Sequence, residues 1–130
     1  MAVFNYKQAI YAGMIAIAGV DGEVTSKEER VVNDIFHQHL DMSRRDRKEV
    51  IQKWKENKEN FTDLVIEELK IHSYSDQKEA FKNIYHFILE RRKAYNLSGK
   101  SREKGVDKDL EELNNYEIRA EKIKKALGLG

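Results

Sequence analysis

The chain has 130 residues, a formal net charge of +1, no cysteine and no proline. This length fits one domain, residues 1–130, with a hydrophobic core of its own. The absence of cysteine excludes disulfides, thiolate metal sites and cysteine nucleophiles. The 24 Lys and Arg side chains are balanced by and interspersed with 23 Asp and Glu, which argues against nonspecific nucleic-acid binding.

The first predicted helix covers residues 3–19 and is rich in alanine and glycine. Small side chains recur every three or four positions, which lets another helix approach closely. Because the helix is apolar nearly all round, we expect it to be central and buried. The small residues are Ala9, Ala12, Gly13 and Ala16.

The same apolar stretch, 9–20, has a competing interpretation as a signal peptide, since Lys7 precedes it and Ala16-Ile17-Ala18 within it resembles a cleavage site. The stretch is too short to span a bilayer. A turn and a capped helix follow directly, and this continuity favours a buried helix of a cytoplasmic protein.

Apolar residues at helical spacing predict five further helices, and no segment alternates with the period of a strand. The fold class is therefore all-α, a compact bundle of six to seven helices. Residues 96–108 are polar and contain two glycines, which predicts a flexible connection. The further helices are expected at 26–41 and 44–57, around Phe61 to Leu69, from Ser75 to Tyr95, and at 109–127.

An acidic loop follows the first helix. Its carboxylates surround the turn residue Gly22 and could hold a hard cation such as Ca²⁺ or Mg²⁺ through oxygen. The spacing is not that of an EF-hand. On this loop alone helix capping is the simpler interpretation, since both Thr25–Glu28 and Ser26–Glu29 match a capping box. The acidic residues of the loop are Asp21, Glu23, Glu28 and Glu29.

A second acidic segment echoes the first. Residues 105–109 repeat the pattern of residues 19–23 and also precede an amphipathic helix. If the two halves of the domain pack face to face, the two segments share one acidic surface, which would attract a cation or a basic partner. Two unrelated helix starts explain the pattern equally well. The acidic residues here are Asp107, Asp109 and Glu117.

The remaining polar clusters favour ordinary surface roles. The basic runs 44–48 and 91–93 are diluted by acids, which is typical of solvated helix faces. His37 and His39 lie two positions apart and point in different directions on a helix. A metal-dependent hydrolase would need His37, His72 and His86 to converge on Asp21. No nucleophile elbow or phosphate-binding glycine loop is present.

The stretch Met14-Ile-Ala-Ile-Ala-Gly-Val-Asp-Gly-Glu-Val-Thr-Ser-Lys-Glu-Glu29 resembles the TerB family of tellurite-resistance proteins, and the ending Leu127-Gly128-Leu129 is similar to that of the family. The resemblance implies about seven helices in two pseudo-symmetric halves, with acidic residues on one face. It also implies a non-enzymatic role in stress-response or membrane-associated complexes, with divalent-cation binding. In the second segment Lys108 stands where the family has glycine.

We therefore expect a non-enzymatic interaction module with a protein partner, no nucleic-acid partner, and peripheral membrane association through a complex. The alternative is a plain protein-interaction scaffold that uses apolar or basic surface between residues 43 and 104, without metal. The expected Ca²⁺ or Mg²⁺ ligands are drawn from Asp21, Glu23, Glu28, Glu29, Asp107, Asp109 and Glu117.

Overall fold

The computed structural model describes residues 3–19, 25–39, 42–97 and 106–129, which form six α-helices and contain no strand. The prediction of an all-α bundle is therefore confirmed. The predicted relation between two pseudo-symmetric halves stays a prediction. The helices are α1 (Tyr6–Ala18), α2 (Ser26–His39), α3 (Arg44–Glu56), α4 (Phe61–Lys70), α5 (Tyr74–Leu97) and α6 (Val106–Ala126).

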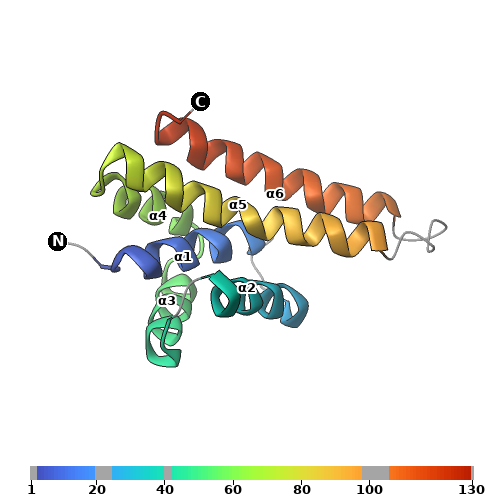
Figure 1. Cartoon of the computed structure of the whole chain (residues 1–130), viewed down its shortest axis with the longest axis horizontal. Coiled ribbons are helices and arrows are strands. Elements are labelled where there is room, and N and C mark those ends of the chain that lie inside the picture. The colour runs from blue at the N-terminus through green and yellow to red at the C-terminus, as the bar shows by residue number, and fades with distance from the viewer. Residues whose placement is uncertain (1–2, 20–24, 40–41, 98–105, 130) are drawn as a thin grey trace.

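Helix α1 is the centre of the bundle and contacts all five other helices (Figure 1). Every residue from Gln8 to Ala18 is buried. Its glycine decides how closely α5 approaches, because a Cβ at Gly13 would stand 2.3 Å from Cδ1 of Ile84. The predicted central helix with small residues at a close contact is confirmed. None of the helices in the described ranges combines the length and the apolarity that crossing a bilayer requires.

The other helices surround α1 in two groups. The long helices α5 and α6 run antiparallel on one side of α1, while α2 and α3 lie on the other side (Figure 1). Helix α4 contacts α1, α5 and α6 and closes the bundle. The inward stripes of these helices meet in one core, in which the largest fully buried aromatic side chains are Tyr11, Phe61, Phe87 and Tyr116.

Several helix ends follow the predicted capping residues. Ser43 accepts a hydrogen bond from the Asp46 amide at the start of α3, and Gly128 ends α6 with a φ of 70° that suits glycine. The start of α5 was predicted wrongly, since Ser73 and not Ser75 accepts from the Asp76 amide at 3.1 Å. Ser73 fits better because the helix already includes Tyr74.

The predicted connection 96–108 is longer than the interval between the helices. Helix α5 continues to Leu97 and α6 begins at Val106. Asp107 and Asp109 therefore belong to the first turn of α6 and not to a loop. Carboxylates are favoured at the positive end of a helix dipole, which explains why the helix extends back through them.

A buried carboxylate, that of Glu68, holds the segment that leads into α1. Oε1 of Glu68 accepts hydrogen bonds from the amides of Val3 at 2.7 Å and Phe4 at 2.6 Å. Replacing Glu68 by alanine should lower the free energy of unfolding by about 1–3 kcal/mol, because two amides lose a charged acceptor. Urea unfolding measures this loss. The exposed neighbour Glu67 is the matched control, and a Glu67→Ala loss of the same size would contradict the prediction.

Candidate functional site

The structure describes only part of the predicted acidic patch. Asp21 and Glu23 lie outside the described residues. Asp107 and Asp109 belong to α6, but their side chains also lie outside what the structure describes. The described members of the patch are Glu28, Glu29 and Glu117.

Glu28 caps the start of α2 and is buried, with 3% of its surface exposed. Its Oε1 accepts from the Thr25 amide at 2.8 Å, while the Thr25 hydroxyl accepts from the Glu28 amide at 3.2 Å. This reciprocal pair confirms the Thr25–Glu28 capping box. The second carboxylate oxygen of Glu28 accepts from the hydroxyl of Tyr116, on α6. The cap of α2 is therefore also a contact between helices.

The hydroxyl of Tyr116 lies between two carboxylates. It contacts Oε2 of Glu28 and Oε1 of Glu112, which is one turn earlier on α6. Oε1 of Glu112 in turn lies 3.6 Å from Nη2 of Arg91, on α5. We call Glu28, Glu112, Tyr116 and Arg91 the carboxylate cluster. A tyrosine hydroxyl has one proton to donate, so it serves only one of the two carboxylates at a time.

The two carboxylates of the cluster repel each other, because both lie against the hydroxyl of Tyr116. Among the described side chains the cluster also contains one guanidinium, that of Arg91. Burial raises the pKa of Glu28, hydrogen bonds from Tyr116 and Thr25 partly oppose this, and the charge of Glu112 raises the pKa further. Burial also raises the pKa of Tyr116, and both carboxylates add to that effect. An additional proton or cation would therefore stabilise this cluster.

The other two described members of the patch do not join the cluster. Oε1 of Glu117 accepts from the hydroxyl of Tyr85 at 2.7 Å and also from Arg92. Glu29 is exposed and lines a groove with Arg47 of α3. Among the described residues the predicted acidic positions are thus divided between three places.

Sequence reasoning missed two residues that complete the cluster. Glu112 and Tyr116 are four apart, a spacing that places them on one helix face and signals a contact. The expectation for Arg91 was wrong, because this side chain is 8% exposed and not part of a solvated face. Burial follows from its position on the face of α5 that packs against α6.

The two histidines whose side chains the structure describes, His72 and His86, give no support to the hydrolase alternative. His72 packs edge-on against Tyr6, with ring centroids 4.9 Å apart, and His86 lies 4.0 Å from Glu90. Asp21 and the side chain of His37 are not among the described residues. In the part of the chain that the structure describes, no group of three or more His, Asp or Glu is placed to hold a metal ion.

Comparison with known families gives one match. The sequence model of the family described as tellurite resistance protein TerB matches residues 7–86, more than half of the chain. The chain belongs to the TerB family. Searches of curated proteins and of solved structures found no match. The TerB match contains the first acidic segment and Glu28, whereas Glu112 and Tyr116 of α6 lie beyond it.

Proposed function

We propose that this TerB-family chain is a non-enzymatic interaction module whose acidic end binds a divalent cation, Ca²⁺ or Mg²⁺. The observation that carries the proposal is the convergence of Glu28 and Glu112 on the hydroxyl of Tyr116. The helices that bear these carboxylates each lie beside one of the two acidic segments of the sequence. Glu28 and Glu112 meet at this hydroxyl, and the proposal is that the acidic segments beside them lie near the same place.

The chemistry of the donors suits a hard cation. Carboxylate oxygens are the ligands that Ca²⁺ and Mg²⁺ prefer, and Ca²⁺ takes six to eight oxygens. Glu28 and Glu112 supply some of them, and Asp21, Glu23 and Asp107 of the two acidic segments are candidates for the others. A bound cation would reduce the repulsion between the carboxylates of Glu28 and Glu112. It would also link α2 to α6, so that its binding changes the surface offered to a partner in a stress-response complex.

A cation titration tests the proposal. Ca²⁺, Mg²⁺ and Zn²⁺ are added separately to isotope-labelled protein while the amide signals of Asp21, Glu23, Glu28, Asp107 and Glu112 are followed. We expect Ca²⁺ or Mg²⁺ to shift these signals and to raise the melting temperature, since a ligand at a hundred times its dissociation constant stabilises by about 2.7 kcal/mol.

A matched pair of variants distinguishes cation binding at the carboxylate cluster from a general effect of the charge of the protein. Glu28→Gln/Glu112→Gln should abolish the cation-induced shift. Glu59→Gln/Glu67→Gln removes the same charge from exposed positions elsewhere and should retain the shift. If the wild-type amides do not respond to any of the three ions, the cation proposal is wrong.

A second candidate function is a plain interaction scaffold without metal. The specific observation in its favour is that the oxygens of Glu28 and Glu117 already accept hydrogen bonds from protein donors. A silent cation titration combined with binding of a protein partner would support this alternative.

A further inference from the structure

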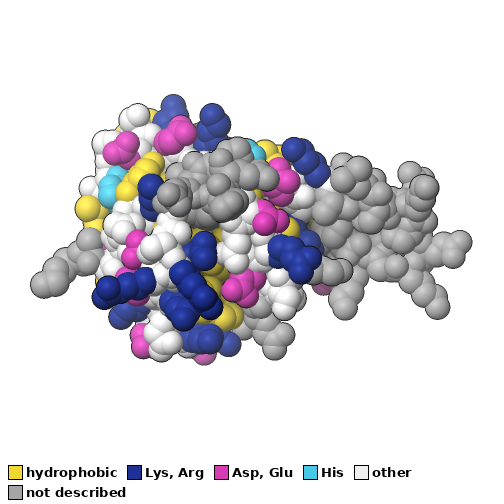
Figure 2. Space-filling model, turned by 60° about the horizontal axis from the view of Figure 1, so that its bottom comes forward, with side chains coloured by type: hydrophobic (Ala, Val, Ile, Leu, Met, Phe, Trp, Pro, Cys, Tyr) yellow, Lys and Arg dark blue, Asp and Glu magenta, His cyan; other side chains and the backbone are white. Residues whose placement is uncertain are grey.

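Positive charge is concentrated on α3. This helix carries six basic and three acidic side chains, a net charge of +3. The remainder of the chain has 18 Lys and Arg against 20 Asp and Glu, a net charge of −2. Helix α3 lies at the bottom of Figure 1, and Figure 2 turns this side toward the viewer and shows several Lys and Arg side chains on it. Helix α3 therefore has a high density of positive charge in a chain that is nearly neutral as a whole.

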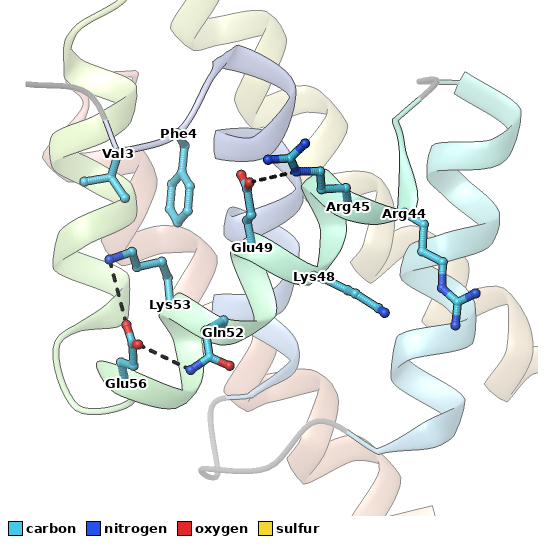
Figure 3. Close-up of a pocket in the computed structure, with 9 residues that line it drawn as sticks. All are labelled: Val3, Phe4, Arg44, Arg45, Lys48, Glu49, Gln52, Lys53 and Glu56. Carbon is cyan, nitrogen blue, oxygen red and sulfur yellow. Dashed lines mark hydrogen bonds and ion pairs between the residues drawn. The ribbon is translucent and has the colours of Figure 1, made fainter.

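A groove of about 780 Å³ runs along this helix, and we call it the α3 groove. Its apolar part comes from Val3, which is 44% exposed, and from Phe4, while side chains of α3 form the rest (Figure 3). Hydrogen bonds to the core hold both sides of the groove, the segment of Val3 and Phe4 and helix α3. Glu68 holds the amides of Val3 and Phe4. Nε2 of Gln8 donates to the carbonyl of Asp46 at 3.2 Å.

The acidic residues of the α3 groove are engaged by neighbours. Glu49 lies 3.8 Å from Arg45 and accepts from Gln8 at 2.9 Å. Glu56 lies 3.8 Å from Lys53 and accepts from Gln52 at 3.3 Å (Figure 3). The carboxylates that could repel an acidic ligand are thus partly neutralised.

Two basic side chains of the α3 groove, Arg44 and Lys48, have no ion-pair partner among the described residues. Both side chains are exposed. These two residues also line a second groove, of about 410 Å³, between α3 and α2. Arg44 and Lys48 therefore form a basic ridge that a ligand can reach from either groove.

We propose that the α3 groove binds an acidic segment of a partner protein. One apolar side chain of the segment lies against Val3 and Phe4, and its carboxylates pair with Arg44 and Lys48. Helix α3 has 13 residues and is about 20 Å long, which an extended segment of about six residues would match. The proposal is independent of cation binding at the carboxylate cluster.

The shape and charge of the groove favour a protein segment over other anionic partners. A nucleic acid is bound chiefly by neutralising many phosphates, and acids intersperse the cations here. A protein that lies on a membrane projects its apolar side chains outward into the lipid. The apolar side chains here line a groove, where a single side chain of a peptide can enter.

The probe is a fluorescein-labelled synthetic peptide in which Asp and Glu flank a central leucine. Binding is followed by fluorescence anisotropy and by the amide shifts of Val3, Phe4 and Gln52. We expect Arg44→Glu/Lys48→Glu to weaken binding at least tenfold. Lys70→Glu/Lys82→Glu, which reverses two exposed charges on α4 and α5, is the control and should bind as the wild type does. Raising the salt from about 0.1 M to about 1 M should weaken binding, because screening shortens from about 10 Å to about 3 Å.

A double-mutant cycle tests the apolar contact. Val3→Ser should weaken the binding of the leucine peptide about threefold and should not change the binding of a peptide with serine at its centre. Thermal melting of each variant confirms that it is folded. The proposal is overturned if the wild-type groove amides do not respond to the peptide, or if both charge-reversal variants lose the same affinity. It is also overturned if Arg44→Glu/Lys48→Glu abolishes binding to phosphatidylserine vesicles or self-association instead of peptide binding.

Discussion

Replacing Gly13 by valine is expected to lower the free energy of unfolding by about 3 kcal/mol or more. A Cβ at this position would lie 2.3 Å from Cδ1 and 2.7 Å from Cγ1 of Ile84. Ile84 is fully buried and branched at Cβ, so its side chain has little freedom to move away. Either α1 and α5 separate, or Ile84 adopts a strained rotamer. Urea unfolding of the two proteins measures the loss.

A rescue variant identifies the cause of this loss. Gly13→Ala should destabilise less, because alanine regains about 1 kcal/mol of helix propensity. Ile84→Val removes the Cδ1 atom nearest to the added Cβ, so Gly13→Ala should cost less in an Ile84→Val background than in the wild type. If the two costs are equal, contact with Ile84 does not explain why glycine is needed.

The contact at Gly13 is one that the sequence could predict. Small residues at helical spacing on an apolar helix indicate a close helix approach, and the structure places α5 there. The same local patterns located the capping box at Thr25 and the cap at Ser43. These features depend on residues within one or two turns, where spacing along the chain determines spacing in space.

The carboxylate cluster could not be predicted in the same way. Glu28 and Tyr116 are 88 positions apart, and their contact depends on how α2 and α6 are each packed against α1 and α5. The sequence shows a glutamate that caps a helix and a tyrosine on an apolar stripe, and both descriptions hold. The sequence does not show that the hydroxyl of Tyr116 meets the carboxylate of Glu28. Arg91 was missed for the same reason, since its burial depends on α6.

The similarity between the two acidic segments predicts where helices begin, but it does not predict which residues the acidic side chains contact. Equivalent positions in a repeat need not face the same surroundings, and Glu117 is held by Arg92 while Glu28 is held by Tyr116. The residue that meets Glu28 is Glu112, whose spacing from Tyr116 signals a contact within α6 but not the contact across to α2. The position of Asp21 relative to Asp107 stays a prediction, and the cation titration is its most direct test.

Removing the hydroxyl of Tyr116 is expected to cost about 2–3 kcal/mol of stability. Tyr116→Phe keeps the ring, which packs edge-on against Phe87 at 5.2 Å, and deletes only the donor between Glu28 and Glu112. The two neighbouring carboxylates then lose the proton donor that they share in the wild type. Tyr85→Phe is the matched control. It removes a hydroxyl that donates to the more exposed Glu117 and should cost less than about 1 kcal/mol.

The pH dependence of stability tests the same cluster. The folded-state pKa of Glu28 lies above its ordinary value of 4.5, chiefly through burial. The folded protein therefore holds a proton that the unfolded chain releases, so this contribution is fully present below pH 4.5 and is lost as the pH rises through the raised pKa. Among the described residues, the acidic and basic groups that face Glu28 include Glu112, Tyr116 and, through Glu112, Arg91.

Glu28→Gln should remove this dependence, because an amide keeps the acceptor for the Thr25 amide and carries no charge. Relative to the wild type, the variant should therefore gain stability as the pH is raised from 4.5 to about 8. Its amide nitrogen also gives Glu112 a donor, so Glu28→Gln should restore part of the stability lost in Tyr116→Phe. Urea unfolding at several pH values measures both effects. A constant difference between Glu28→Gln and the wild type across this range would show that folding does not raise the pKa of Glu28, and would contradict the prediction.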